Sequence, residues 1–158
     1  MKIGVISDTH LSCVNSRLIE LYNNYFTNVD MIIHAGDAVS AEIIDFLGQK
    51  HLHAVQGNMD SKEIQDWLPR KKIFEANGVR IGLIHGWGSP IGIEKRIKLE
   101  FEDTQVIVYG HSHRAVNHIH DDVLFFNPGT ATGFCADGIH SIGILDVGRN
   151  ITGTIITI

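Results

Sequence analysis

Short clusters of carboxylate, imidazole and amide side chains recur along this chain, and each cluster follows an apolar stretch that has the character of a β-strand. The five clusters are Asp8-Thr9-His10, Gly36-Asp37, Gly57-Asn58, His85-Gly86 and Gly110-His111-Ser112-His113. Together they supply two carboxylates, four imidazoles and one amide. Such a set suits two transition-metal ions that keep coordination positions open for water.

The spacing within the clusters favours a shared site. Side chains at positions i and i+2 of an extended segment point the same way, so Asp8 with His10, and His111 with His113, are each expected to aim at one point. In open α/β sheets, ligands bind at the carboxyl ends of the strands, which is where these clusters lie. Glycines next to the ligands allow sharp turns and close approach of the backbone.

Each cluster also has a simpler interpretation. A lone Asp-x-His or His-x-His pair is most often a pair of solvated loop residues, and Asp37 could serve only as the N-cap of a following helix. Five such clusters at one sheet edge are hard to attribute to coincidence. The sequence therefore favours a metal centre.

The elements between the clusters indicate the fold class. Apolar runs at 2–7, 31–35 and 51–55 alternate with helical patterns at 14–26 and 40–47, which predicts parallel strands with helical crossovers. Asn77-Gly78 between two apolar runs predicts a two-residue hairpin. A helix at 91–101, a buried strand at 105–110 and antiparallel strands to the end of the chain follow. Two sheets packed face to face, with helices outside, accommodate both halves.

The bulk properties limit the function classes. The 158 residues suit one domain, and the net charge of −5 argues against an extended nucleic-acid surface. The apolar run at the N-terminus is too short for a signal peptide or a membrane span, so no membrane association and a cytoplasmic location are expected. Cys13 and Cys135 are not spaced as a redox pair and are expected to stay reduced.

The order of the clusters resembles that of the calcineurin-like metallophosphoesterases, specifically their small single-domain, YfcE-like phosphodiesterase branch. The match runs over nearly the whole chain, and Asn127-Pro128-Gly129-Thr130 is similar to a late turn of that family. The resemblance implies an α/β fold, a four-layer α/β/β/α sandwich of two mixed sheets formed by residues 1–158 as a single metallophosphoesterase domain.

The resemblance also implies roles for the clustered residues. It places one metal on Asp8, His10 and His113, and the other on Asn58, His85 and His111, with Asp37 as the bridge between the two. The implied reaction is hydrolysis of a small phosphodiester by a hydroxide bridging two divalent ions, with Mn²⁺ as the first choice and Ni²⁺, Co²⁺, Zn²⁺ or iron as alternatives. The implied catalytic residues are Asp37, Asn58 and His85, and those contacting substrate are Asn58 and Arg114.

Met59 departs from the pattern of the wider superfamily. Many members read Gly-Asn-His-Glu or Gly-Asn-His-Asp here, and the histidine is the proton donor to the leaving group. A thioether cannot donate a proton, and such assistance is typically worth ~10²–10⁴ in rate. Met59 is therefore either an apolar wall for a substituent or ordinary packing. Asp60 is expected to cap the following helical turn rather than orient a ligand.

Two other function classes remain open at this point. The small scaffold subunit of retromer keeps the same fold but serves in protein assembly, so a catalytically weak metal-binding module is the alternative to an enzyme. A barrel-type metal amidohydrolase also uses a His-x-His pair, but that fold needs ~250 residues with the pair on an early strand. The resemblance allows a homo-oligomer, although no apolar stripe predicts its interface.

Overall fold

The first of two sheets contains the N-terminal parallel strands. The computed structural model describes residues 1–135 and 138–158. The sheet has the order β10-β9-β1-β2-β3, with bounds β1 (Lys2–Ile6), β2 (Met31–His34), β3 (Leu52–Ala54), β9 (Ser141–Val147) and β10 (Ile151–Thr157). Strands β1, β2 and β3 are parallel, whereas β9 and β10 are antiparallel to their neighbours. This mixed sheet confirms the predicted change from parallel units to hairpins.

The second sheet has the order β4-β5-β6-β8-β7, with bounds β4 (Lys71–Ala76), β5 (Val79–Ile84), β6 (Val106–Val108), β7 (Ala115–His120) and β8 (Val123–Pro128). Its three central strands are parallel and its two edge strands antiparallel. Asn77 and Gly78 join β4 to β5, and both have positive φ, as a type I′ turn requires. The hairpin prediction is confirmed.

The helices are short and begin at polar caps. They are α1 (Ser16–Leu21), which continues into the π-helix η1 (Tyr22–Phe26), α2 (Ala41–Leu47), α3 (Lys62–Trp67) and α4 (Ile93–Lys98). The Asn15 side chain accepts the Leu18 N–H, and the Ser40 side chain accepts the Glu42 N–H. Because Ser40 caps α2, Asp37 is not needed as its N-cap. None of the helices in the described residues is long and apolar enough to cross a membrane.

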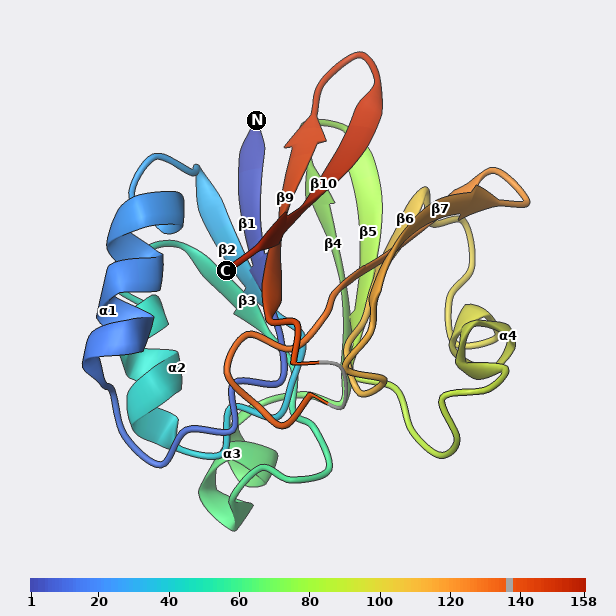
Figure 1. The fold of residues 1–158 in the computed structure, drawn as a ribbon. Coiled ribbons are helices and arrows are strands. Elements are labelled where there is room, and N and C mark those ends of the chain that lie inside the picture. The colour runs from blue at the N-terminus through green and yellow to red at the C-terminus, as the bar shows by residue number, and fades with distance from the viewer. Residues whose placement is uncertain (136–137) are drawn as a thin grey trace.

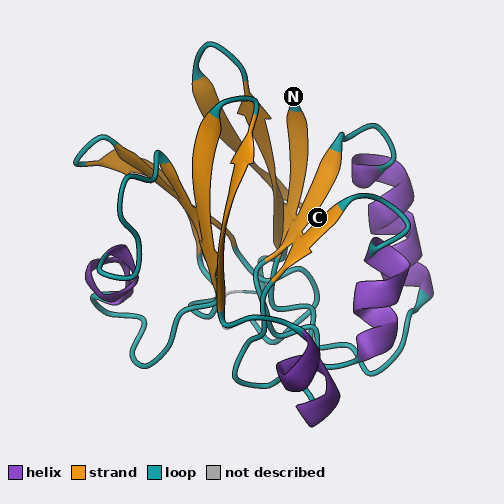
Figure 2. Cartoon of the chain, turned by 180° about the vertical axis from the view of Figure 1, so that it is seen from behind, coloured by secondary structure: helices purple, strands orange, loops and turns teal. Residues whose placement is uncertain are grey.

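The layers stack as the sequence predicts (Figures 1 and 2). Residues such as Val5, Leu83 and Phe126 are buried between the two sheets. A second apolar cluster, which includes Leu18 and Ile43, packs α1 and α2 on the outer face of the first sheet. A third, which includes Ile97, packs α4 on the outer face of the second sheet. The result is a four-layer α/β/β/α sandwich of two mixed sheets.

The strand directions determine where the loops meet. In Figure 1, the strands β1, β2, β3, β5 and β6 all end toward the bottom of the view, and the loops that follow them gather there. Figure 2 shows the same gathering from behind. Because every one of the five polar clusters lies in one of these loops, or at the last residue before it, the fold concentrates them at one end of the sandwich.

Candidate metal centre

Asp8, His10 and His113 form the first group of side chains that could hold a cation. Asp8 and His10 follow β1, and His113 follows β6. The Nε2 atom of His113 lies 3.2 Å from Asp8 Oδ1, and that of His10 lies 3.8 Å from the same oxygen. The two Nε2 atoms are 3.3 Å apart. All three potential ligand atoms lie within 4.8 Å of one another, close enough to contact one ion.

Asp8, Asp37 and His85 form the second group. Asp37 follows β2, and His85 directly follows β5, so this group draws on both sheets. Asp37 Oδ2 lies 3.3 Å from His85 Nε2 and 3.6 Å from His10 Nε2. The Asp37 carboxylate therefore lies near an imidazole of each group, as a ligand shared by two ions would, and Asp8 belongs to both groups.

Asn58 and His111 lie at the rim of this cluster. His111 Nδ1 is 2.9 Å from Asn58 Oδ1, and its Nε2 is 2.8 Å from the Gly88 carbonyl oxygen. The His111 and His85 rings contact edge to face, with centroids 5.2 Å apart. His111 is not part of either group of carboxylates and imidazoles. The structure thus brings five of the seven candidates into direct proximity and places two beside them.

The donor set fits a cation, because two buried polar atoms have no other partner. Among the described residues, Asp8 Oδ1 and His85 Nε2 are buried without a hydrogen bond, although each faces another group of the cluster. Burying a polar atom without a hydrogen-bond partner lowers the stability of the fold unless an ion or a water molecule contacts that atom. His85 Nδ1 is 2.7 Å from the Ala35 carbonyl oxygen and must donate to it, which leaves the Nε2 lone pair for a metal. His113 is held in the same way by the Phe134 carbonyl oxygen, at 2.6 Å.

The electrostatics of the cluster keep its carboxylates charged. Burial opposes ionisation of Asp8, but its contacts with His10 and His113 outweigh burial and hold its pKa below the usual range. The contact with Asp8 raises the pKa of His113 to about 9. For His85, burial lowers the pKa and the Asp37 carboxylate raises it, with a net rise. A cation that binds His113 must therefore displace the proton that the raised pKa of this residue favours.

The prediction from the sequence assumed that the backbone at these residues is extended, so that side chains at i and i+2 point the same way. The structure shows that it is not. Five of the candidates, Asp8, His10, Asp37, His111 and His113, have φ values between 50 and 66°. This left-handed conformation is sparsely populated by residues with a Cβ and is typical of functional sites where surrounding contacts enforce it. The side chains converge because the chain turns sharply after each strand, not because neighbouring residues alternate along it.

Asp60 is a residue whose role the sequence prediction misjudged. Ser61, not Asp60, caps α3, since its side chain accepts the Ile64 N–H. The buried Asp60 carboxylate instead accepts N–H groups of Asp37 (3.2 Å), Val39 (2.6 Å) and Gly57 (2.6 Å). It therefore ties the loop that carries Asp37 to the loop that carries Asn58. Through these hydrogen bonds, Asp60 positions the two loops that carry the candidate ligands without being one of those ligands itself.

Asp60→Asn is expected to weaken divalent-ion binding by ~10–100-fold, the usual effect of losing a group that orients metal ligands. An asparagine amide presents N–H groups where the backbone donors need an acceptor. Metal affinity of purified protein, measured by calorimetry, tests this. Asp66→Asn is the matched control, because Asp66 is an exposed residue of α3 that pairs with Lys62 on the same helix. Equal metal affinities in the two variants would show that Asp60 does not orient the metal ligands.

The late turn at Asn127–Thr130 braces two ligand loops. Asn127 Nδ2 donates to the Gly110 carbonyl oxygen at 2.8 Å, just before His111. Thr130 Oγ1 donates to the Asp8 carbonyl oxygen at 2.8 Å. Both residues are fully buried. These bracing contacts give a physical reason for the similarity of this turn to that of the resembled family.

Glycines next to the ligands permit close approach, as predicted. A Cβ on Gly57 would lie 2.1 Å from Asp37 Oδ1, and one on Gly110 would lie 2.0 Å from Ser7 Oγ. The Ser7 hydroxyl in turn donates to Asp8 Oδ2 at 2.6 Å. No larger residue fits between these loops and the carboxylates, so the packing of the centre depends on both glycines.

Met59 and Arg114 are the remaining residues singled out by the sequence. The Met59 N–H donates to Asp37 Oδ1 at 2.7 Å, and its side chain is 59% exposed. The packing interpretation of Met59 is therefore wrong, while an apolar wall beside the centre is compatible with its position. Arg114 is exposed, its backbone exchanges hydrogen bonds with the Ser112 hydroxyl, and its guanidinium forms none with the described residues. Its guanidinium is available to a substrate anion.

Comparisons with known proteins agree with this geometry. The calcineurin-like phosphoesterase superfamily domain matches residues 1–150. A probable metallophosphoesterase of Methanocaldococcus jannaschii is 40% identical over 136 residues, which are 84% of this chain and 69% of that protein. The solved structure of an archaeal phosphodiesterase has a TM-score of 0.73 and 30% identity, covering 99% of this chain and 100% of the other.

One further solved structure shows the same fold without indicating a function. Vacuolar Protein Sorting 29 from Cryptosporidium parvum has a TM-score of 0.74 at 22% identity, covering 99% of this chain and 98% of that one. The match at residues 1–150 and the relative at 40% identity, in contrast, show the family. This chain is therefore a member of the calcineurin-like phosphoesterase superfamily.

Proposed function

We propose that this chain, acting as one metallophosphoesterase domain over residues 1–158, hydrolyses a small phosphodiester at two divalent ions, of which Mn²⁺ is our first choice. The observation that carries the proposal is the pair of buried, unpartnered atoms, Asp8 Oδ1 and His85 Nε2, which face the Asp37 carboxylate and the His10 and His113 imidazoles. The archaeal phosphodiesterase of the same fold supports the choice of a diester.

In this proposal, Asp8, His10 and His113 would hold one ion, Asn58, His85 and His111 would hold the other, and Asp37 would be shared by both sites. When bound, two divalent ions supply a nucleophile derived from water and stabilise charge on the phosphoryl group. Asp8 and Asp37 neutralise only part of the ionic charge, so the centre attracts a phosphate anion. Asn58 contributes a neutral oxygen that keeps the centre electrophilic, and Arg114 binds a phosphate oxygen.

The residues near the centre also suggest which substrates react. Met59 offers no proton to a leaving group, so the reaction is expected to favour leaving groups that depart as stable anions. No nucleophilic side chain is needed, because the attack is made by water. A covalent enzyme intermediate is therefore not part of the proposed mechanism.

Hydrolysis of bis-p-nitrophenyl phosphate by Mn²⁺-reconstituted protein tests the proposal. We expect turnover of this diester, weaker turnover of p-nitrophenyl phosphate, and loss of both after chelation of the metal. The same protein depleted of metal is the control. A protein that binds two ions but cleaves neither ester with any of the divalent ions named above would contradict the enzymatic role.

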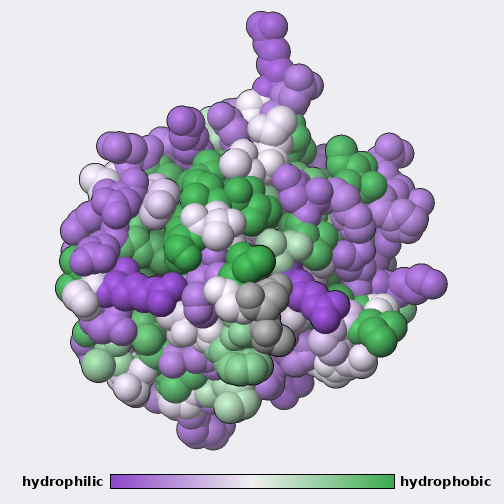
Figure 3. All heavy atoms as spheres, in the orientation of Figure 1, coloured by the Kyte–Doolittle hydropathy of each residue, from purple (hydrophilic) through white to green (hydrophobic). Residues whose placement is uncertain are grey.

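The alternative is a metal-binding scaffold with weak or no activity. Two observations favour it. The Vacuolar Protein Sorting 29 structure shares the fold, and large apolar side chains are exposed near the centre, including Phe134 (81%), whose carbonyl group holds His113. Figure 3 shows apolar residues gathered near the middle of the face that it displays, with polar residues around them. A stable protein partner without diester turnover would favour this role.

A further inference from the structure

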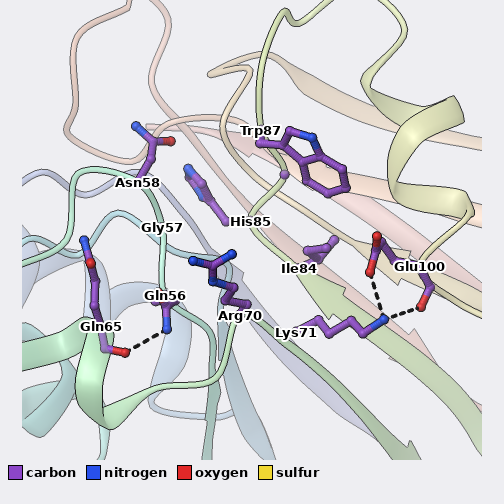
Figure 4. Close-up of a pocket in the computed structure, with 11 residues that line it drawn as sticks. Gln56, Gly57, Asn58, Gln65, Arg70, Lys71, Ile84, His85, Trp87 and Glu100 are labelled. Carbon is purple, nitrogen blue, oxygen red and sulfur yellow. Dashed lines mark hydrogen bonds and ion pairs between the residues drawn. The ribbon is translucent and has the colours of Figure 1, made fainter.

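A pocket adjoins the candidate metal centre and shares two of its residues. It has a volume of about 530 Å³, and Asn58 and His85 form part of its wall. The rest of the wall comes from the segment after β3, from α3, from the start of β4 and from the loop after β5 (Figure 4). A diester bound at the metal centre would therefore extend one of its two substituents into this pocket.

Of the two cationic side chains that line the pocket, one is paired and the other has no partner among the residues that the structure describes. Lys71 Nζ is 2.8 Å from Glu100 Oε2 and 3.0 Å from the Glu100 carbonyl oxygen, so its charge is already paired. The exposed Arg70 guanidinium forms no hydrogen bond or ion pair with the described residues, and Figure 4 shows it pointing into the pocket. A guanidinium stays charged at all relevant pH values and presents a planar fork that matches carboxylate and phosphate oxygens.

The opposite wall is flat and apolar. The Trp87 indole lies across the pocket from Arg70, near the side chain of Ile84 (Figure 4). Arg96 holds the loop that carries Trp87, because its Nη2 donates to the Trp87 carbonyl oxygen at 3.0 Å and its Nη1 donates to the Ile91 carbonyl oxygen at 3.1 Å. Trp87 is 44% exposed, which leaves much of its surface available for stacking with a ring.

Two glutamine side chains supply free acceptors. Gln56 Nε2 donates to the carbonyl oxygens of Gln65 (2.9 Å) and Leu68 (2.6 Å), and Gln65 Nε2 donates to that of Asp60 (2.8 Å). Because these partners are carbonyl groups, they fix the orientation of both amides. The Oε1 atoms of Gln56 and Gln65 form no hydrogen bond with the described residues, and both glutamines lie across the pocket from Trp87 (Figure 4).

We infer that this pocket binds a nucleotide as one substituent of the diester: its planar ring stacks on Trp87, and a second phosphate pairs with Arg70. This inference rests on the proposed function, since it names the substrate class of that site. A ring and an additional anion on one substituent match the indole and the unpaired guanidinium together. Arg70 and Trp87 would then determine specificity.

Binding of three phosphate compounds to Mn²⁺-reconstituted protein tests the inference without turnover. The probes are ribose 5-phosphate, adenosine 5′-monophosphate and adenosine 3′,5′-bisphosphate, which add first the ring and then the second phosphate. Affinity is measured by calorimetry and by fluorescence of Trp87 in a Trp67→Phe background. We expect each addition to tighten binding by about tenfold, in line with a stacked ring or a charge-assisted pair worth about 1.4 kcal/mol.

Variants separate the two contacts. Arg70→Gln is expected to abolish the preference for the bisphosphate over the monophosphate, and Trp87→Ala to abolish the preference for the monophosphate over ribose 5-phosphate. Arg149→Gln is the matched control, because Arg149 lies in the exposed turn between β9 and β10, away from the loops of the metal centre (Figure 1). It should keep both preferences.

The outcomes distinguish the pocket from the proposed function. Equal affinities for the three probes, or preferences that survive Arg70→Gln and Trp87→Ala, would overturn the inference of a nucleotide site. This holds even if bis-p-nitrophenyl phosphate is hydrolysed. If the affinities follow the expected pattern but the protein hydrolyses no diester, the nucleotide site is supported and only the enzymatic role is contradicted.

Discussion

Asp37→Asn is expected to lower the kcat for bis-p-nitrophenyl phosphate by about 10³-fold or more, because metal-ion stabilisation is worth several kcal/mol and each 1.4 kcal/mol is tenfold in rate. Asp37 contacts imidazoles of both groups, and its Oδ1 accepts the Met59 N–H. An asparagine amide has one acceptor oxygen and no negative charge, whereas two cations that share this residue need both oxygens of a carboxylate. The number of bound Mn²⁺ ions per chain should fall in parallel.

The control for this prediction is a substitution of the same kind outside the centre. Asp45→Asn changes an exposed residue of α2 and should leave kcat and metal content unchanged. Circular dichroism of both variants shows whether the fold is retained. A folded Asp37→Asn protein with normal turnover would show that Asp37 is not the bridge.

Met59→His is the second large effect that we expect, in this case a gain. The Met59 backbone is anchored to Asp37 Oδ1 and the residue is exposed, so we expect an imidazole at this position to reach a bound leaving group. General acid assistance is typically worth ~10²–10⁴, with the largest effect on poor leaving groups. We therefore expect a gain of about 10²-fold for diphenyl phosphate and little change for bis-p-nitrophenyl phosphate.

The pH profile identifies the cause of that gain. An imidazole acting as an acid should add a falling limb to the rate above its pKa, which the wild-type protein lacks. Met59→Gln is the control, because its amide is polar but is not a proton donor of suitable pKa. A gain that is the same for both leaving groups, or that Met59→Gln reproduces, would mean that Met59 acts through shape alone.

Local signals in the sequence were sufficient for most of the elements. Asn77-Gly78 predicted the hairpin, and Ser40 with Gly48 predicted the two ends of α2, because each depends on backbone conformations set within a few residues. The parallel pairing of β6 with β8 was not predicted. That pairing joins segments with a whole strand between them, and no local pattern specifies it.

The site was predictable in position but not in detail. The strand ends predicted that Asp8 and Asp37 would meet, since they follow neighbouring parallel strands, and His85 joins them because β5 of the second sheet ends at the same end of the sandwich. The left-handed backbone of Asp8 and the role of Asp60 were not predictable, because both depend on hydrogen bonds between loops distant in sequence. Arg70 likewise has no local signal, and only the fold places it beside His85.

The measurement that tests the central claim most directly is a titration of metal-depleted protein with Mn²⁺ while hydrolysis of bis-p-nitrophenyl phosphate is recorded. The two groups of ligands around Asp8 and Asp37 predict that activity appears with the second equivalent of metal and levels off at two per chain. Full activity at one equivalent, or no activity at any ratio despite metal binding, would contradict a two-metal phosphodiesterase.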